Sequence, residues 1–218
     1  MTEQQSEPTS KSDDAPTRPS SRFARFPWIT TAIIIALVVS IIVPDLLFDR
    51  LRPDLPRDAL AEIEEQVRDR YTSLTHVDIA SVPRLESTGP ELVIFDVREA
   101  VEHQASHIPG AIQVDPNISA VEFMRLYGRE VADKQVLFYC SVGRRASRLA
   151  VRVERPLAAA GTRIHNLSGG IFRWFGEDQP LNNAAGEVVD YIHPYNRSVA
   201  RLMPKANPET APDFQMLP

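Results

Sequence analysis

The sequence of 218 residues contains a single cysteine, Cys140. One cysteine excludes an intramolecular disulfide and a metal cage built from several thiolates, so burial and hydrogen bonding have to hold the fold. Metal-ligand spacing is also absent around the histidines His76, His103, His165 and His193. We therefore expect neither a metal ion nor a cofactor.

Positive charge is not in excess, because the formal net charge is -5 at pH 7. A general nucleic-acid binder needs a basic face, so this class of protein is excluded. A content of 43% hydrophobic and 24% charged residues is typical of a globular protein. The length predicts one domain of ordinary size with room for an anchor and tails, and no internal repeat divides it.

Apolar side chains are scarce at the N-terminus, where the first residues are mostly Ser, Thr, Pro, Glu, Gln and Asp. Such a segment buries too little apolar surface to offset the entropy of ordering it. We predict a disordered tail over residues 1–26.

Charge is absent from Trp28 to Val43, WITTAIIIALVVSIIV. Continued to Phe48, this run reaches about 20 residues, which is enough to span the hydrocarbon of a bilayer. A buried core helix would be shorter or amphipathic, and a cleaved signal peptide would end in a small-x-small site, which Pro44 and Asp45 do not provide. The run predicts a transmembrane helix over residues 27–48.

Arginines flank this run on both sides, and those on the far side are mixed with aspartates. Arg22 and Arg25 precede it, which favours a cytoplasmic N-terminus. We therefore expect a single-pass membrane protein whose following domain lies on the opposite side of the membrane.

Residues 54–74 show the pattern of an amphipathic helix. Apolar side chains recur at intervals of three and four residues, and Asp54 with Pro56 forms a suitable helix start. The apolar positions are Leu60, Ile63, Val67, Tyr71 and Leu74. We predict a linker helix here that joins the anchor to the domain.

Short apolar runs then alternate with helical patterns as far as residue 178, which indicates an α/β domain with a parallel sheet over residues 75–178. The expected strands are 92–97, 111–114, 135–140 and 163–167, and the expected helices are 119–127 and 146–160. Repeated prolines after Trp174 forbid long regular elements. Residues 179–218 are therefore predicted to be a Pro-rich extension that wraps the domain or hangs free.

Cys140 ends the apolar run VLFYC and stands directly before a predicted helix. In an open α/β sheet, sites form beyond the carboxyl ends of the strands, and the free N–H groups of a helix start favour a thiolate. Gly143 lets the loop curl, and Arg144 or Arg145 can neutralise an anionic ligand. The alternative is that Cys140 is a buried strand residue beside solvated arginines, but packing alone does not explain this combination.

The segment CSVGRRAS at 140–147 resembles the active-site loop of rhodanese-like sulfurtransferases. DVREAVEHQASHIPGA at 96–111 resembles the first signature of that family, and NLSGGIFRW at 166–174 resembles the second signature through Gly169, Gly170 and Trp174. The departures are Ala100 in place of proline, His103 in place of an aromatic residue and Ser106 in place of glycine.

The resemblance implies a five-stranded parallel sheet with helices on both faces, and a catalytic Cys140 that cycles between free and persulfidated forms. The active-site and substrate-binding loop would then be Ser141, Val142, Gly143, Arg144 and Arg145. We expect the loop N–H groups to surround the charged sulfur and Arg145 to bind the donor, with a contribution from Arg144. His107 would supply a loop-stabilising hydrogen bond, and Asp96 would be a loop and cap residue.

These features predict a thiosulfate or persulfide sulfurtransferase that passes a sulfane sulfur to cyanide or a thiol acceptor. The alternative is a membrane-tethered persulfide carrier or binding module that serves a protein acceptor with little turnover of small molecules. A phosphatase or arsenate reductase of related fold would need an arginine six places after the cysteine, and that position is Ala146.

Overall fold

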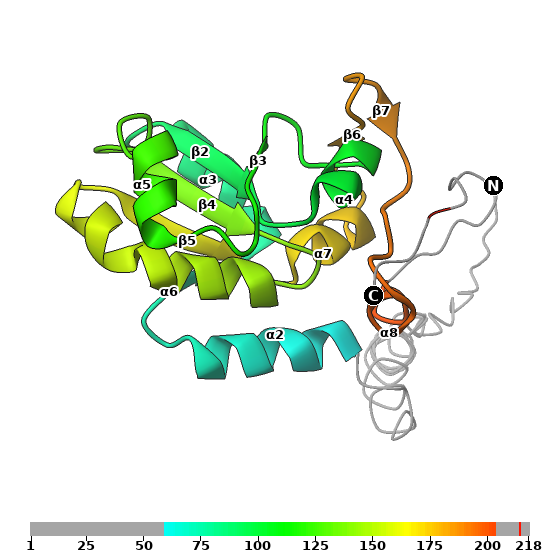
Figure 1. The fold of residues 1–218 in the computed structure, drawn as a ribbon. Helices are drawn as coiled ribbons and strands as arrows, with labels where there is room; N and C mark the ends of the chain where they lie inside the picture. The colour runs from blue at the N-terminus through cyan, green and yellow to red at the C-terminus, as the bar shows by residue number, and fades with distance from the viewer. Residues whose placement is uncertain (1–58, 204–213, 215–218) are drawn as a thin grey trace, which may run out of the picture. The chain divides into compact units, whose positions relative to one another are not determined.

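A computed structural model describes residues 59–203 and 214 (Figure 1). The predicted tail over residues 1–26 and the predicted transmembrane helix over residues 27–48 lie outside these residues. No helix within the described ranges has both the length and the apolar character needed to cross a membrane.

The centre of the domain is a five-stranded sheet in the order β1-β5-β4-β2-β3, and every neighbouring pair is parallel. The strands are β1 (Thr75–Val77), β2 (Leu92–Asp96), β3 (Ile112–Gln113), β4 (Gln135–Tyr139) and β5 (Arg163–Leu167). The expected α/β class with a five-stranded parallel sheet is confirmed. The central strand β4 is buried along its whole length, as its continuous apolar sequence requires.

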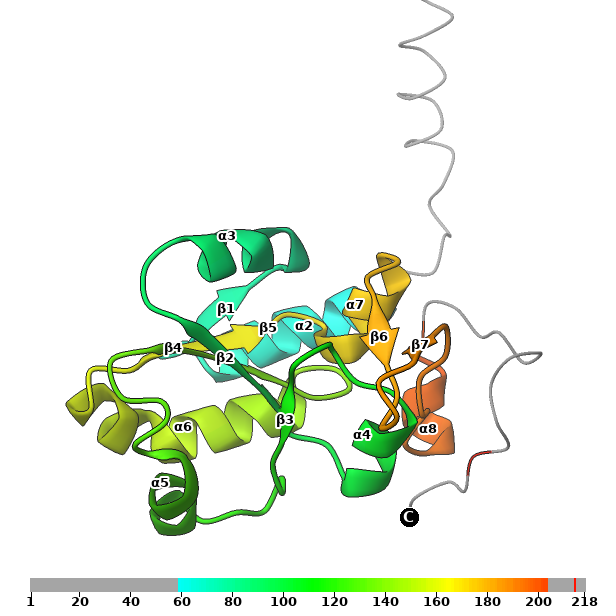
Figure 2. The same ribbon diagram turned by 90° about the horizontal axis from the view of Figure 1, so that it is seen from above.

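Helices cover both faces of this sheet, as Figure 2 shows for α5 and α6 on one side and α3 and α7 on the other. The described helices of the domain are α2 (Ala59–Arg70), α3 (Val82–Ser87) after a 3-10 turn, α4 (Ala100–Ala105), α5 (Ala120–Tyr127), α6 (Arg144–Ala159) and α7 (Gly170–Gly176). Alternate residues of β4 face opposite cores, since Leu137 belongs to the same core cluster as Phe172, whereas Phe138 belongs to the cluster that contains Leu149.

The predicted linker helix is shorter at its C-terminal end than expected, since α2 ends at Arg70 rather than at residue 74. The N–H of Leu74 donates to the Tyr71 carbonyl in a turn, and β1 begins at Thr75. Leu74 is buried in the core through this turn and not along a helix face. Leu74 therefore fits the apolar spacing of the helix although it lies outside the helix.

The C-terminal extension packs against the domain over its described part. A hairpin of β6 (Leu181–Asn182) and β7 (Val188–Val189) is followed by the short helix α8 (Arg197–Ala200). Asn182 exchanges two backbone hydrogen bonds with His107, and Ile192 is buried in the core. Of the two expected alternatives, the extension wraps the domain as far as residue 203.

Candidate active site

Cys140 lies directly after β4, and α6 begins four residues later at Arg144, two residues earlier than the sequence pattern predicts. Gly143 is the residue before the helix and has a φ of 87°. A Cβ atom at this position would lie 3.4 Å from Nδ2 of Asn166, in a backbone conformation that other residues rarely adopt. Glycine is therefore required for the loop to turn into α6.

Backbone hydrogen bonds from the start of α7 hold this loop in place. The N–H groups of Ile171 and Phe172 donate to the carbonyls of Cys140 and Ser141 at 2.9 and 3.1 Å. Gly170 has a φ of 55°, and a Cβ atom there would lie 2.2 Å from the Cys140 carbonyl oxygen. The paired glycines of the segment at 166–174 thus have a physical reason, because only glycine lets α7 approach the cysteine backbone so closely.

The N–H groups of the loop are available to a ligand. Between described residues, no hydrogen bond is donated by the backbone N–H groups of residues 141–146. These groups form the start of a 16-residue helix, where the helix dipole favours negative charge. Cys140 itself is only 1% exposed. An anionic sulfur on this residue would therefore be stabilised in a largely dry environment.

Arg145 turns toward the loop and is held there by several contacts. Its guanidinium donates to Glu102 from Nη1 at 2.6 Å and from Nη2 at 2.9 Å, and Nη2 also donates to Oγ of Ser141 at 2.9 Å. Burial alone would lower the pKa of Arg145, but the hydrogen bonds to Glu102 and the negative charges of Cys140 and Glu102 raise it above its ordinary value. The side chain is a permanent cation beside the cysteine.

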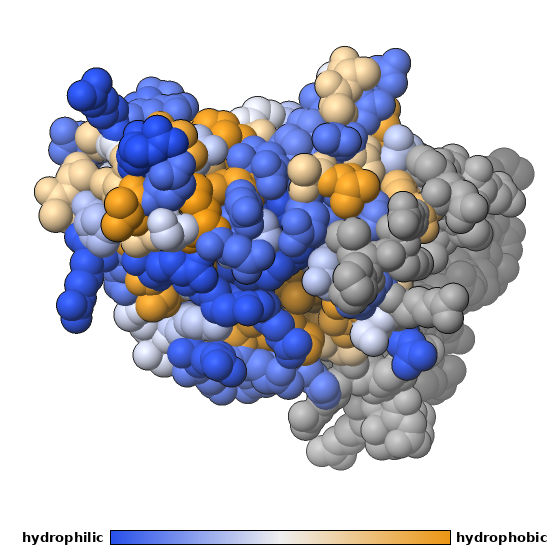
Figure 3. Space-filling model, in the orientation of Figure 1, coloured by the Kyte–Doolittle hydropathy of each residue, from blue (hydrophilic) through white to orange (hydrophobic). Residues whose placement is uncertain are grey.

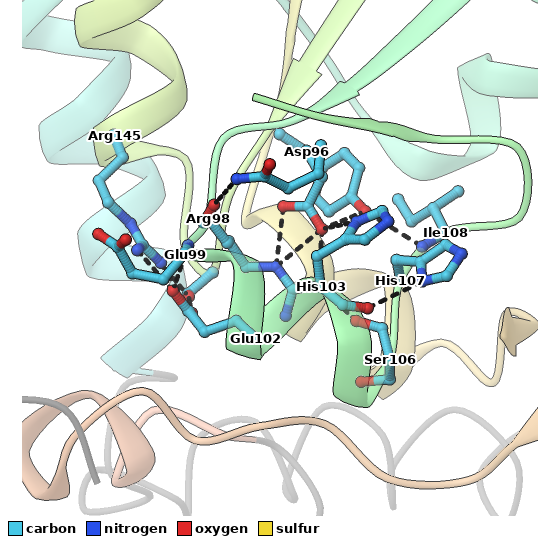
Figure 4. A network of polar contacts seen from close by, with 12 residues as sticks. Asp96, Arg98, Glu99, Glu102, His103, Ser106, His107, Ile108 and Arg145 are labelled. Carbon is cyan, nitrogen blue, oxygen red and sulfur yellow. Dashed lines mark hydrogen bonds and ion pairs between the residues drawn. The ribbon is translucent and has the colours of Figure 1, made fainter. Parts of the chain in front are cut away.

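Glu102 is the residue whose role the sequence reasoning missed. Its carboxylate is fully buried and accepts hydrogen bonds from Ser141, Arg145 and the N–H of Glu99 (Figure 4). The Glu99–Glu102 spacing forms a capping box at the start of α4, which was a signal in the sequence. The hydrogen bonds that Glu102 accepts from Arg145 could not be predicted from that spacing.

Arg144 and Val142 lie differently from the rest of the loop. Arg144 is exposed, and its Nη2 donates to Oε1 of Gln66 on α2 at 2.9 Å. Together with Arg70 and Arg148, Arg144 lines a cavity of about 820 Å³ between α2 and α6. Val142 is buried in the core beneath the loop. The structure therefore brings Cys140, Ser141 and Arg145 together and turns Arg144 toward α2.

A buried ionic network supports the loop from the side of β2. The carboxylate of Asp96 accepts from Nη2 of Arg98 at 2.7 Å, from the hydroxyl of Tyr139 at 2.8 Å and from His103 at 3.0 Å (Figure 4). Burial would raise the pKa of Asp96, but the charge of Arg98 and these hydrogen bonds outweigh it and lower the pKa to about 2. Asp96 is thus a buried anion that fixes the turn after β2.

The three departures from the family signature are accommodated in this region. The ring of His103 stacks on that of His107 with centroids 3.9 Å apart, so it takes the place of an aromatic ring. Ser106 has an extended backbone with a φ of −163°, for which glycine is not needed. Nδ1 of His107 donates to the His103 carbonyl at 2.9 Å, in agreement with a loop-stabilising hydrogen bond. Ala100 is simply the first residue of α4.

Comparison with known proteins shows what the central part of this chain is similar to. The model of the rhodanese-like domain family matches residues 83–177. A thiosulfate sulfurtransferase of Azotobacter vinelandii is 27% identical over 144 residues, which are 57% of this chain and 53% of that protein. The chain thus spans about half the length of this curated relative.

The solved structures that the comparison found include the thiosulfate sulfurtransferase of Pseudomonas aeruginosa, with 20% identity and a TM-score of 0.44 over 67% of this chain and 26% of that chain. Another is a rhodanese-like domain protein of Staphylococcus aureus, with 16% identity and a TM-score of 0.37 over 53% of this chain and 99% of that chain. Residues 83–177 are therefore similar to the rhodanese-like domain family, and the curated relative that the chain resembles is a thiosulfate sulfurtransferase.

Proposed function

We propose that this protein is a sulfurtransferase that moves a sulfane sulfur from thiosulfate or a persulfide donor to cyanide or a thiol through a persulfide on Cys140. The observation that carries this proposal is the environment of the cysteine, with the unpaired N–H groups of described residues 141–146 and the Arg145 cation around one thiol. The name of the Azotobacter vinelandii relative supports the same reaction class.

In the first step, the Cys140 thiolate attacks the outer sulfur of thiosulfate. A new S–S bond forms to Cys140, the S–S bond of thiosulfate breaks, and sulfite leaves with the electron pair. The charge that arrives on the terminal sulfur of Cys140 faces the loop N–H groups. Arg145 neutralises the anionic donor, and Glu102 with Ser141 holds its guanidinium in place.

In the second step, cyanide or a thiolate bonds to the terminal sulfur. The S–S bond to Cys140 breaks, and the electron pair returns to Cys140 as a thiolate, so that thiocyanate or a new persulfide leaves. No proton has to be moved at the cysteine in either half of this cycle. The cycle therefore needs the thiolate form of Cys140 but no general base in the loop.

The burial of Cys140 favours a second candidate function. At 1% exposure the thiol is almost closed to free small molecules. A membrane-tethered carrier that opens only against a protein acceptor would have the same geometry and little turnover of thiosulfate with cyanide. A phosphatase is disfavoured, because the position six places after the cysteine is Ala146, which is fully buried.

A kinetic comparison separates the two candidates. The full-length protein in nonionic detergent is assayed for thiocyanate formation from thiosulfate and cyanide over many turnovers, beside Cys140→Ser. Sustained turnover by the unsubstituted protein alone supports the enzyme. Uptake of one sulfur without further turnover supports the carrier. Thiocyanate formation by Cys140→Ser at the same rate contradicts both.

We also propose that residues 27–48 anchor the protein in a membrane, with the N-terminus cytoplasmic and the domain on the other side. This rests on the uncharged run of the sequence and on Arg22 and Arg25 before it. Alkylation of Cys140 in sealed vesicles with a membrane-impermeant reagent tests the orientation. Labelling only when the cytoplasmic face is outward would contradict it.

A further inference from the structure

A second polar cavity lies beside the loop, and Arg145 is the one residue of its lining that the proposed chemistry uses. It has a volume of about 170 Å³ and lies between the start of α6, residues 116–117 and Tyr195 of the C-terminal extension. Its charged lining consists of Arg145, Arg148, Arg152 and Glu99. Since one water takes about 30 Å³, the cavity has room for a group of a few heavy atoms.

Two of the three arginines in this cavity have no carboxylate partner among the described residues. Arg145, Arg148 and Arg152 are spaced three and four residues apart and so share one face of α6. Arg145 is paired with Glu102, but within the described part of the chain Arg152 donates only to the neutral carbonyl of Ile118 at 2.5 Å. Arg148 makes no hydrogen bond or ion pair with any described residue.

This imbalance is local, because the whole chain has a net charge of −5. The only carboxylate in the lining, that of Glu99, already accepts from the backbone at the start of α4. The surface over α6 is correspondingly among the strongly hydrophilic parts of the face in Figure 3. No ion pair joins Glu99 to Arg148 or Arg152 among the described residues, so these two guanidinium groups, which no described carboxylate contacts, provide a site for an anion with two acidic groups.

The extension completes the cavity. The ring of Tyr195 lies over the Arg145 guanidinium, 4.5 Å from its centroid. Tyr195 has a φ of 62°, and its N–H donates to Nδ1 of His193 at 3.0 Å. A tyrosine in the left-handed region is uncommon and costs free energy, so the surrounding structure has to hold it there. The ring of Tyr195 therefore forms one wall of the cavity. It lies against Arg145, which also contacts Ser141 beside Cys140.

We propose that this cavity binds the acidic part of the sulfur acceptor, which is a small thiol carrying at least two carboxylates. This inference rests on the proposed function and specifies its acceptor. The acidic groups lie between Arg148 and Arg152, and the thiol extends past Arg145 toward the persulfide. The acceptor thiolate bonds to the terminal sulfur, the S–S bond to Cys140 breaks, and the electron pair returns to Cys140.

The test compares two thiols on the full-length protein, kept in nonionic detergent and loaded with sulfur from thiosulfate. Mercaptosuccinate carries two carboxylates and thioglycerol carries none. The double variant Arg148→Gln/Arg152→Gln is expected to raise the KM for mercaptosuccinate about tenfold or more, because it removes two charge-assisted contacts. The KM for thioglycerol is expected to stay within about twofold of the original value. Arg155→Gln, on the same helix and outside the cavity, serves as the matched control and is expected to change neither KM.

An equal change for both thiols, or no change for either, would overturn the inference. A direct measurement keeps this test independent of sulfur loading. Succinate binding to the same proteins is followed by calorimetry, and the double variant is expected to bind about tenfold more weakly or not measurably, while Arg155→Gln binds as before. Failure of the protein to take up sulfur while succinate binds would refute the proposed function and leave this site supported. Equal succinate binding by all three proteins would refute the site.

Discussion

The carboxylate of Glu102 holds the guanidinium of Arg145 through two parallel hydrogen bonds of 2.6 and 2.9 Å. Glu102 is fully buried on α4 and Arg145 is at the start of α6, 43 residues further along the chain. The pair therefore connects the first signature segment to the cysteine loop. Bidentate geometry of this kind fixes the plane of the guanidinium as well as its position.

We predict that Glu102→Gln weakens both the fold and the reaction. Loss of a charge-assisted contact from a buried pair is expected to lower the free energy of unfolding by about 2 kcal/mol. We also expect kcat/KM for thiosulfate to fall about tenfold, because Arg145 is no longer fixed beside Ser141. Denaturant unfolding and the thiocyanate assay measure the two effects.

Glu122→Gln is the matched control for this variant. Glu122 makes the same two-pronged contact with Arg125, at 2.9 and 2.6 Å, on the exposed side of α5. It is expected to leave kcat/KM unchanged and to have little effect on unfolding. A Glu102→Gln protein with the kcat/KM of the original would mean that the buried pair does not position Arg145 for the reaction.

Gly170→Ala is predicted to disrupt the contact between α7 and the cysteine loop. The added Cβ atom would lie 2.2 Å from the carbonyl oxygen of Cys140, so the backbone has to move in addition to adopting an unfavourable φ. We expect a loss of about 3 kcal/mol or more in unfolding free energy, combining the two penalties. Gly186→Ala has a similar positive φ of 81° with no atom within 4 Å, and about 1 kcal/mol is expected there. Equal losses for the two variants would contradict the close approach.

Protonation of Asp96 makes the unfolding free energy of the domain depend on pH. Its pKa of about 2 in the folded protein lies below the ordinary value of 3.8, so the unfolded chain binds the proton more readily. The resulting stabilisation of about 2 kcal/mol is fully present above about pH 4 and is lost as the pH falls toward about 2. Unfolding free energies measured across this range are expected to show that decline.

Asp96→Asn is expected to be destabilised at neutral pH by about 3 kcal/mol or more, because it leaves Arg98 buried without its counter-charge. The exposed Asp190→Asn is the control and is expected to retain both the neutral stability and the acid decline. If Asp96→Asn were as stable as Asp190→Asn at pH 7, the buried pair would not contribute to the fold.

The central strands were the part of the fold that the sequence predicted best, because their apolar runs are a strong signal. The apolar runs at 92–97 and 135–140 predicted two central strands, because strands buried on both faces need such runs. The strand at 163–167 was predicted from the alternation of short runs with helical patterns. β1 was missed, since it has three residues of which only Val77 is buried. α4 was missed as well, because six residues are too few to show a helical period.

The candidate site was predictable in part for similar reasons. Cys140 and Gly143 are marked by their position between a strand and a helix, and the structure brings Arg145 to the same place. The buried role of Glu102 depends on a contact between distant segments, which no local pattern encodes. Tyr195 lies in a stretch without periodicity, and only the packing of the extension brings it to Arg145.

The most direct test of the central claim is the intact mass of the full-length protein after incubation with thiosulfate and removal of excess reagent, beside Cys140→Ser. The account predicts an added mass of one sulfur atom on the unsubstituted protein, removed by cyanide with release of thiocyanate, and no addition to Cys140→Ser. Absence of the added sulfur with both thiosulfate and a persulfide donor, or the same addition on Cys140→Ser, would contradict it.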